Sequence, residues 1–460
     1  MQGAAVKCVC DLTVGEDSEG AVPGRDLDAG RLTTLLAGLP ALTSMGWLRL
    51  RADLHRRPTA TAARAFLAGA MRAIARCSGL QTLRLRITLR DGLADQLPET
   101  LVRELASVRS LEEVGLHIES SAAEWPDRPV TFSLAHVVAG LAGLPRLRAL
   151  ELMAYNVGMD ATLPASMSCL AQLTSLRLSG FQGLRCAPGW ARLPALACLS
   201  FEHCVFAGDG ETALPGLAAL AALTSFGLWE CPNVWVLPAS LWRLTQLREL
   251  FHWGDASELA GEPRGALPVA VVPTGGALCS ASLTHFTLAD LNLPAFPPGI
   301  LAMRRLKHLD LSQSDFELLP EGVSVLTGLE ELRLGRHSLV AMKVGGAFDA
   351  RALGSLAGFP KLRGLEFSYC RVLFSSDFQA AAAHPRLERL LLWTSYPVLG
   401  PSCQAFVEFV ITLLRQGRHD VLELDRAAVQ GEGQVDSRKF RAALEAVGYP
   451  LSEADSLDPV

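Results

Sequence analysis

A short leucine phrase, Leu-x-x-Leu-x-Leu with conservative exchanges, returns along almost the whole chain. Successive copies are separated by 23 to 36 residues, and a weaker copy lies near residues 45–50. Self-similarity at a period of this length predicts a solenoid, in which about thirteen structural repeats stack on their neighbours. The fourth position of the phrase is occupied in turn by Leu83, Val114, Leu150, Leu176, Leu199, Phe226, Leu250, Phe286, Leu309, Leu332, Leu365 and Leu390.

Length and composition agree with one continuous array. A globular chain of 460 residues would usually divide into two or more domains, but a solenoid avoids this limit because each repeat packs only on its neighbours.

Hydrophobic residues make up 50% of the chain. Charged residues nevertheless interrupt every apolar stretch before the length of about 18 residues that suggests a transmembrane helix. We therefore expect no membrane span.

Three Leu-Pro steps lie between copies of the phrase, at Leu163-Pro164, Leu237-Pro238 and Leu319-Pro320. From Leu319 to Leu329 the match continues through a whole repeat. On these residues the chain resembles the leucine-rich-repeat superfamily, and within it the short intracellular proteins of the plant Ras-group type. The resemblance implies an α/β solenoid, a horseshoe of about thirteen repeats with a parallel β-sheet on the concave side and short helices or irregular coils on the convex side.

Breaks in the pattern divide the chain into three parts. We expect an N-terminal cap strand and acidic loop at 1–40, the repeat array at 41–395 with an irregular insert at 255–282, and a helical C-terminal cap and tail at 396–460. Apolar periodicity predicts the cap strand at residues 5–14, a convex-side helix at 60–77, and cap helices at 403–415 and 437–447. A short strand-like stretch lies at 421–424.

Cysteines recur three residues after the last leucine of the phrase. This column holds Cys204, Cys231 and Cys370, with Ser314, Ser395, Tyr155 and Phe181 in other repeats. In the family this side chain bonds the backbone between neighbouring coils, so the resemblance implies a structural role. The alternative, a nucleophile or metal ligand, would need a partnered base or further convergent ligands. His203 does not serve Cys204 in this way, because neighbours in a strand point to opposite faces.

Large aromatic residues occupy the outward positions in the middle of the array. Trp229, Phe251 and Trp253 lie there, and Glu202, His203, Glu230 and Glu249 lie in the same or neighbouring coils. An exposed aromatic patch with a polar rim is typical of a protein-binding hot spot. The alternative is that the Gly- and Pro-rich insert 255–282 folds over these aromatics and buries them. His252, at a strand leucine position, is interpreted as a buried neutral histidine.

A second aromatic pair, Tyr369 and Trp393, falls on adjacent repeats near the C-terminal end. We rank this pair second as a partner-binding patch. The alternative is that the pair makes capping contacts with the C-terminal segment.

Cysteine usage and charge bear on the compartment and on the partner. The 11 cysteines are scattered singly, there is no Asn-x-Ser/Thr site, and the N-terminus lacks a secretory pattern, which favours a reducing intracellular, cytoplasmic location. A net charge of -5 offers no basic footprint for nucleic acid. We expect no metal and no cofactor.

The sequence contains no Gly-rich phosphate loop, zinc-protease motif or nucleophile elbow. The leading hypothesis is therefore a monomeric, non-catalytic scaffold that binds a protein partner on the concave face. One alternative is the substrate-recognition subunit of a ubiquitin-ligase or signalling complex, which usually carries a further domain before the repeats. Another is an enzyme built into the array, since fold alone does not determine function.

Overall fold

The structure is a computed structural model, and it describes residues 8–14, 45–53, 60–89, 105–120, 132–155, 159–208, 210–234, 236–254, 272, 281–291, 293–314, 316–335, 347–393, 395–424 and 435–449. Contacts divide the chain into an N-terminal unit, residues 1–234 and 238–241, and a C-terminal unit, residues 235–237 and 242–460. The predicted division at residues 40 and 395 stays a prediction.

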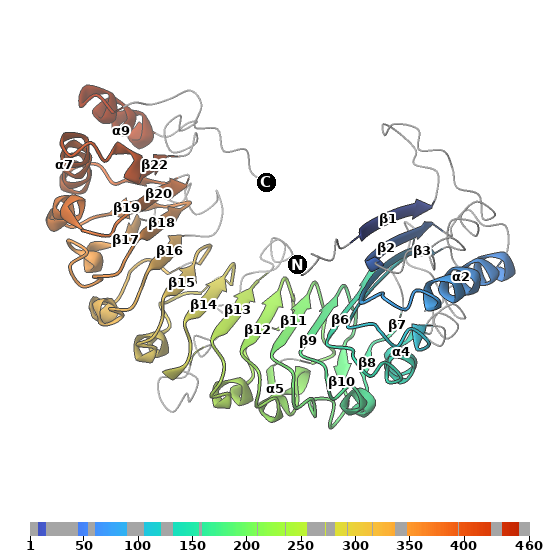
Figure 1. The fold of residues 1–460 in the computed structure, drawn as a ribbon. Coiled ribbons are helices and arrows are strands. Elements are labelled where there is room, and N and C mark those ends of the chain that lie inside the picture. The colour runs from blue at the N-terminus through green and yellow to red at the C-terminus, as the bar shows by residue number, and fades with distance from the viewer. Residues whose placement is uncertain are drawn as a thin grey trace, which may run out of the picture. The chain divides into compact units, whose positions relative to one another are not determined.

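The N-terminal unit is built on a parallel sheet in which each strand pairs with the strand of the next repeat (Figure 1). Its strands, in sheet order, are β1 (Cys8–Val14), β2 (Met45–Asp53), β3 (Thr82–Leu89), β4 (Glu113–Ser120), β6 (Ala149–Tyr155), β9 (Ser175–Ser179), β11 (Cys198–Glu202) and β12 (Ser225–Trp229). The edge strand predicted at 5–14 is thus present as β1.

The C-terminal unit repeats this construction. Its main strands are β13 (Glu249–Trp253), β14 (His285–Ala289), β15 (His308–Leu311), β16 (Glu331–Gly335), β18 (Gly364–Ser368), β20 (Arg389–Trp393) and β22 (Leu422–Leu424). The strand-like stretch predicted at 421–424 is β22, which pairs in parallel with β20 and adds one more strand to the sheet.

The phrase leucines stack directly on one another across the strands. Leu150 pairs with Leu176, and Leu176 pairs with Leu199. All three are at most 2% exposed. Because each fully buried leucine contributes about 1.5–3 kcal/mol, these ladders form the core that holds neighbouring repeats together.

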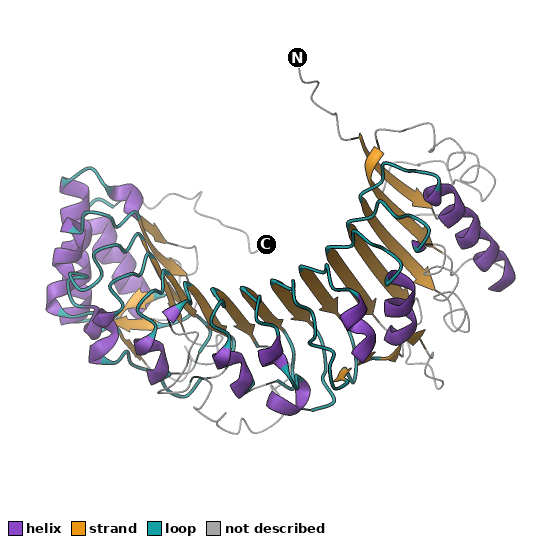
Figure 2. Ribbon diagram, turned by 60° about the horizontal axis from the view of Figure 1, so that its bottom comes forward, coloured by secondary structure: helices purple, strands orange, loops and turns teal. Residues whose placement is uncertain are grey.

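In the part of the chain that the structure describes, helices and turns cover one face of each sheet, and no described helix lies on the other face (Figure 2). We call the uncovered side the open face. In the N-terminal unit the covering elements include α2 (Ala60–Ala75), α4 (Leu134–Leu141), η2 (Ala165–Cys169), α5 (Gly210–Ala213) and η3 (Leu217–Ala219). The helix predicted at 60–77 is confirmed as α2, which buries Ala70, Met71 and Ile74. Short strands pair away from the main sheet, namely β5 (Phe132–Ser133) with β7 (Met159–Asp160) and β8 (Thr162–Leu163) with β10 (Arg185–Cys186).

The C-terminal unit carries mostly 3-10 turns before its terminal helices. They are η7 (Pro298–Ala302), η8 (Glu321–Val325), η9 (Arg351–Leu353), η10 (Ser376–Ala383) and η11 (His419–Val421), while η4 (Ala239–Arg243) lies between β12 and β13 in the chain. A small parallel sheet joins β17 (Ala347–Asp349), β19 (Arg371–Leu373) and β21 (Tyr396–Pro397).

Two helices close the C-terminal end, as the periodicity predicted. They are α7 (Pro401–Arg415) and α9 (Val435–Ala446). Phe406 of α7 is buried, and its ring centroid lies 5.3 Å from that of Phe374 and 5.7 Å from that of Phe440 in α9. This aromatic cluster ties α7 and α9 to the coil before η10.

Several strands are followed directly by a residue in the left-handed conformation. In the N-terminal unit these residues are Gly180, His203 and Glu230, with φ of 78°, 48° and 49°. The amide of His203 donates to the carbonyl of Trp229 at 2.8 Å, so the turn is tied to the next strand. Non-glycine residues with positive φ are uncommon. At His203, the hydrogen bond to the neighbouring coil holds this conformation at the edge of the open face.

Candidate functional site

The open face of the N-terminal unit is defined by the residues that alternate with the buried leucines. Strand register aligns them in two rows that cross β2, β3, β4, β6, β9, β11 and β12. The first row is Arg49, Arg84, Gly115, Glu151, Arg177, Ser200 and Gly227, and the second row is Arg51, Arg86, His117, Met153, Ser179, Glu202 and Trp229.

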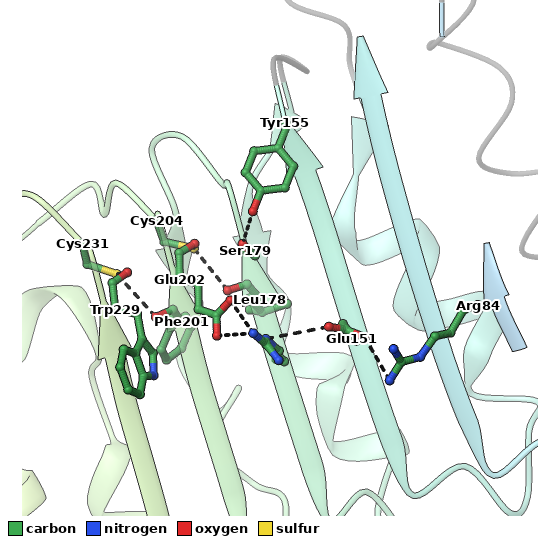
Figure 3. A network of polar contacts seen from close by, with 11 residues as sticks. Arg84, Glu151, Tyr155, Leu178, Ser179, Phe201, Glu202, Cys204, Trp229 and Cys231 are labelled. Atoms are coloured by element: carbon green, nitrogen blue, oxygen red, sulfur yellow. Dashed lines mark hydrogen bonds and ion pairs between the residues drawn. The ribbon is translucent and has the colours of Figure 1, made fainter. Parts of the chain in front are cut away.

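A chain of ion pairs joins residues from four of these strands, β3, β6, β9 and β11 (Figure 3). Arg84 lies 3.9 Å from Glu151, and Arg177 lies 3.7 Å from Glu151 and 2.6 Å from Glu202. Isolated pairs of this kind add little stability at a surface, about 0–1 kcal/mol each. Their effect here is to hold long side chains in defined positions across the face. Glu151 lies between two arginines, and Arg177 lies between two glutamates.

Aromatic and histidine rings lie along the same face, on β4, at the end of β6 and after β11. His117 and Tyr155 make an edge contact with ring centroids 5.5 Å apart, and Tyr155 and His203 lie 6.5 Å apart. The Tyr155 hydroxyl and the Ser179 hydroxyl share a hydrogen bond of 2.7 Å. His203 Nδ1 lies 3.1 Å from a carboxylate oxygen of Glu230.

The sequence interpretation of Tyr155 was wrong. It was placed in the column that bonds the backbone between coils, but β6 extends to Tyr155, so alternation carries its side chain to the open face. The longer apolar alternation from Leu150 to Ala154 was the signal that could have shown this.

Trp229 is half-buried rather than fully exposed, because its ring lies back along its own strand. A Cβ atom at Gly227 would lie 2.7 Å from the Trp229 Nε1, so the ring occupies the space that the glycine leaves free. Glu202, on the neighbouring strand, pairs with Trp229 in register and binds Arg177. The structure therefore brings Trp229, Glu202, His203 and Glu230 together on β11, β12 and the turns that follow them.

The other predicted anchors belong to the C-terminal unit. Phe251, Trp253 and Glu249 are half-buried on the open face of β13, and His252 between them is 1% exposed, which confirms the expected buried histidine. Glu249 pairs in register with His285 of β14, whose ring stacks on that of His308 with centroids 4.2 Å apart. The alternative that the insert 255–282 buries these aromatics concerns residues outside the described part of the chain, apart from Val272 and residues 281–282.

Tyr369 and Trp393 are both half-buried in the C-terminal unit. Tyr369 follows β18 in the left-handed conformation, with φ of 53°, and its amide donates to the carbonyl of Trp393 at 2.9 Å. The two residues are therefore adjacent on neighbouring repeats, as the sequence predicted.

Cys204 and Cys231 of the cysteine column have the structural role that the resemblance implied. Cys204 Sγ lies 3.5 Å from the carbonyl oxygen of Leu178 in the preceding coil and 3.3 Å from that of Glu202. Cys231 Sγ lies 3.7 Å from the carbonyl oxygen of Phe201. Burial raises the pKa of Cys204 to about 12, so its thiol stays protonated at neutral pH. The exposed His203 lies on the other side of the chain from this thiol.

Thiol reactivity should divide the described cysteines into two groups. At pH 8 in native buffer, a maleimide is expected to modify the exposed Cys169 and Cys198 within minutes, because the thiolate is the reactive species and access is free. Cys204 and Cys231 should stay unmodified, since burial raises the pKa of each and blocks access. Peptide mapping by mass spectrometry reports each site, and modification in denaturant is the control. Native modification of Cys204 as fast as Cys198 would contradict its structural role.

A hollow of about 350 Å³ lies on the open face of the N-terminal unit and was missed by the sequence reasoning. Arginines from β2 and β3 line it together with residues of β4 and β6. The available signal was the repeated outward spacing of arginines in Leu-Arg-Leu-Arg on two consecutive repeats. The hollow is lined by Arg49, Arg51, Arg84, Leu85, Arg86, Gly115, Leu116, His117, Glu151 and Met153.

These features define the class of the protein. Parallel strands that carry in-register copies of one leucine phrase, each followed by a short helix or coil, make it a leucine-rich-repeat solenoid. The assignment to the short plant Ras-group type stays a prediction.

No family model and no curated protein matches the chain. Among solved structures it is similar to an internalin from Listeria monocytogenes, with 14% identity and a TM-score of 0.43 over 72% of this chain and 79% of the internalin. A leucine-rich-repeat protein from Leptospira interrogans has 16% identity and a TM-score of 0.43 over 84% of this chain and 91% of its own. The ectodomain of an Arabidopsis thaliana receptor kinase has 12% identity and a TM-score of 0.30, over 84% of this chain and 53% of its own.

Within the described ranges, no helix is both long enough and apolar enough to span a bilayer. In the same ranges, no three His, Cys, Asp or Glu side chains converge as metal ligands would.

Proposed function

We propose that the protein is a non-catalytic interaction scaffold that binds a protein partner on the open face of its sheet. The observation that carries this proposal is the cross-strand network from Arg84 through Glu151 and Arg177 to Glu202. Side chains that are already held in place lose less conformational entropy when a partner binds. A face of this kind is suited to recognition of another surface.

The proposed anchors are Trp229 in the N-terminal unit, and Phe251 and Trp253 in the C-terminal unit. Trp, Tyr and Arg dominate the binding energy of protein interfaces, and surrounding polar groups exclude water from them. Glu202, His203, Glu230 and Glu249 are the proposed rim. Tyr369 and Trp393 are proposed as a second contact patch for the same partner.

We also propose that the protein acts as a monomer in a reducing, intracellular compartment. Cys77, Cys169, Cys186, Cys204 and Cys231 carry free thiols, which supports this proposal. Size-exclusion chromatography with light scattering tests the monomer directly.

The partner-binding proposal predicts a large loss of capture when the anchors are removed. A Trp229→Ala, Phe251→Ala, Trp253→Ala variant should retain less than a tenth of the partner bound by the unchanged chain, because a single hot-spot residue can contribute about 2 kcal/mol or more. The measurement is quantitative mass spectrometry after affinity purification from native extract, with both proteins first shown to be folded by circular dichroism.

Leu318→Ala is the matched control, since Leu318 is 59% exposed and lies outside the strands. It should capture the partner as the unchanged chain does. Equal capture by the triple variant would show that these aromatics do not anchor a partner, and the same assay with Tyr369→Ala and Trp393→Ala would then test the second patch.

A further inference from the structure

Four neighbouring strands of the C-terminal unit each place a titratable side chain in one row of the open face. The strands β13, β14, β15 and β16 follow one another in the sheet (Figure 1). Strand register pairs Glu249 with His285, His285 with His308, and His308 with Glu331. All four alternate with buried residues and are partly exposed, so protons reach them from solvent. We call Glu249, His285, His308 and Glu331 the histidine row.

The two histidines form a stacked pair in the middle of this row. Their ring centroids lie 4.2 Å apart, and the ring planes differ by 9°. Neutral imidazole rings can stack in this way, but two protonated rings repel each other at such a distance. The stack is therefore stable only while at least one of the two rings is neutral.

Each histidine also has a glutamate on its outer side. His308 Nδ1 lies 3.3 Å from a carboxylate oxygen of Glu331. His285 Nδ1 shares a hydrogen bond of 3.0 Å with the Thr284 hydroxyl, and Glu249 occupies the opposite position on the next strand. A protonated ring can thus exchange its ring neighbour for a carboxylate by a change of side-chain rotamer. The row has two arrangements, a central stack or two outer ion pairs.

The surroundings favour the stacked arrangement at neutral pH. Burial lowers the pKa of His285, and positive charge at His308 and Lys307 acts in the same direction. The carboxylates of Glu249 and Glu331 act against it. Because His285 binds its proton less readily in the folded chain than in the unfolded chain, the stacked form loses stability as the pH falls below the ordinary histidine value of about 6.5.

Other charged groups near the row have partners or lie at its end. Lys307 is bound by Glu330 at 2.9 Å, and Arg333 in the next row lies 3.8 Å from Asp310. Arg389 of β20 lies at the same position as the row, two strands beyond its last member. The groups whose charge changes between neutral and weakly acidic pH are therefore the two stacked histidines.

The histidine row begins beside the proposed aromatic anchors. Glu249 shares the open face of β13 with Phe251 and Trp253 and is a proposed rim residue. Phe251 pairs in register with Thr287, which lies two residues after His285 on β14. If His285 turns from the stack to Glu249, it neutralises a rim carboxylate at the edge of the aromatic patch.

We propose that the histidine row is a pH switch for partner binding. At neutral pH the two rings stack and the Glu249 carboxylate contacts the partner, whereas in acid each ring turns to its own glutamate and the partner is released. This inference rests on the proposed function and adds the regulation of that site.

An NMR titration of the full chain with ¹³C-labelled histidine side chains tests the switch without the partner, and His285→Gln identifies the His285 signal. We expect that signal to titrate below about pH 6.5. His308→Gln removes the like charge and should raise the midpoint by about 0.7 of a pH unit, the effect of a charge about 4 Å away in water. Glu249→Gln should lower the midpoint, because a carboxylate favours the protonated ring. His136→Gln, at an exposed position of α4 in the N-terminal unit, is the matched control and should leave it unchanged.

Release is measured on the immobilised chain, loaded from native extract at pH 7.5 and washed at about pH 5.5, where histidines are protonated. The proteins monitored are those whose capture is lost in the Trp229→Ala, Phe251→Ala, Trp253→Ala variant. The acid wash should lower their amount on the unchanged chain at least about fivefold, the lower end of typical coupling between sites.

His285→Phe, His308→Phe is the locked variant, because its rings can stack but take up no proton. It should keep the captured proteins through the acid wash, while His136→Gln should release them as the unchanged chain does. Circular dichroism at both pH values checks that each variant is folded.

An unchanged His285 midpoint in His308→Gln would overturn the proposal, and so would equal release by the unchanged chain and the locked variant. If proteins that depend on the anchors stay bound to the unchanged chain in acid, the scaffold stands and the switch does not. If no captured protein depends on the anchors, the scaffold proposal fails and a switch in partner binding fails with it, whatever the His285 titration shows.

Discussion

Replacing Phe201 by alanine is expected to lower the free energy of unfolding by about 3–5 kcal/mol, the usual cost of removing a large buried aromatic side chain. Phe201 is fully buried on β11. Its ring centroid lies 5.1 Å from that of Phe206 and 6.4 Å from that of Phe226. The cavity would therefore open between two coils, because these rings belong to neighbouring repeats. Urea unfolding followed by circular dichroism measures the change from the shift in midpoint.

Ser200→Ala is the control for this prediction, because Ser200 is the neighbouring residue on β11 and faces the open side. The Ser200 Oγ is buried without a hydrogen-bond partner among the described residues, so its removal breaks no bond. The change in unfolding free energy should stay within about 0.5 kcal/mol. Equal effects of the two substitutions would show that Phe201 is not part of a packed interior.

Gly335→Ala is expected to destabilise the C-terminal unit by about 1–3 kcal/mol through overpacking. A Cβ atom at Gly335 would lie 2.5 Å from the backbone carbonyl oxygen of Ser368, and it would also collide with the Ser368 hydroxyl. Gly335 and Ser368 are paired in register at the ends of β16 and β18. The backbone cannot move aside as a flexible side chain could, so the two strands must separate locally. Thermal unfolding by calorimetry measures the effect.

Gly322→Ala provides the matched control in the same unit. The nearest atom to its added Cβ is Leu301 Cδ1 at 3.5 Å, an ordinary contact, and Gly322 lies inside the 3-10 turn η8. The substitution should be neutral or stabilise by up to about 1 kcal/mol, because alanine loses less entropy on folding than glycine. A larger loss at Gly322 than at Gly335 would contradict the packing described for β16 and β18.

Much of the fold could be predicted because the repeated phrase acts locally. The leucine period predicted the strands, their parallel stacking and the buried positions, and the apolar stripes predicted α2, α7 and α9. Burial of His252 and the structural use of Cys204 and Cys231 also followed from position in the repeat. Each of these features depends on which residues share a face within one repeat.

The predicted site was less accurate where contacts between repeats decide the outcome. Trp229 occupies the expected face, but its ring lies along the strand because residue 227 is glycine. Tyr155 joins the open face because β6, with seven residues, extends past the end of the five-residue β9 beside it. The hollow was not predicted, since it exists only when register places Arg49 beside Arg84 and Gly115 beside Glu151.

By itself, the sequence determined the solenoid class, the buried ladder and the faces on which side chains lie, because hydrophobic burial follows the period of the phrase. The tertiary structure decided which outward residues meet. Insertions of different length separate the copies in the chain, so Arg86 and Glu119, 33 residues apart, or Arg177 and Glu202, 25 residues apart, become partners only through strand register. Charge and shape on the open face are therefore properties of the stacked repeats, while the core is already a property of each repeat.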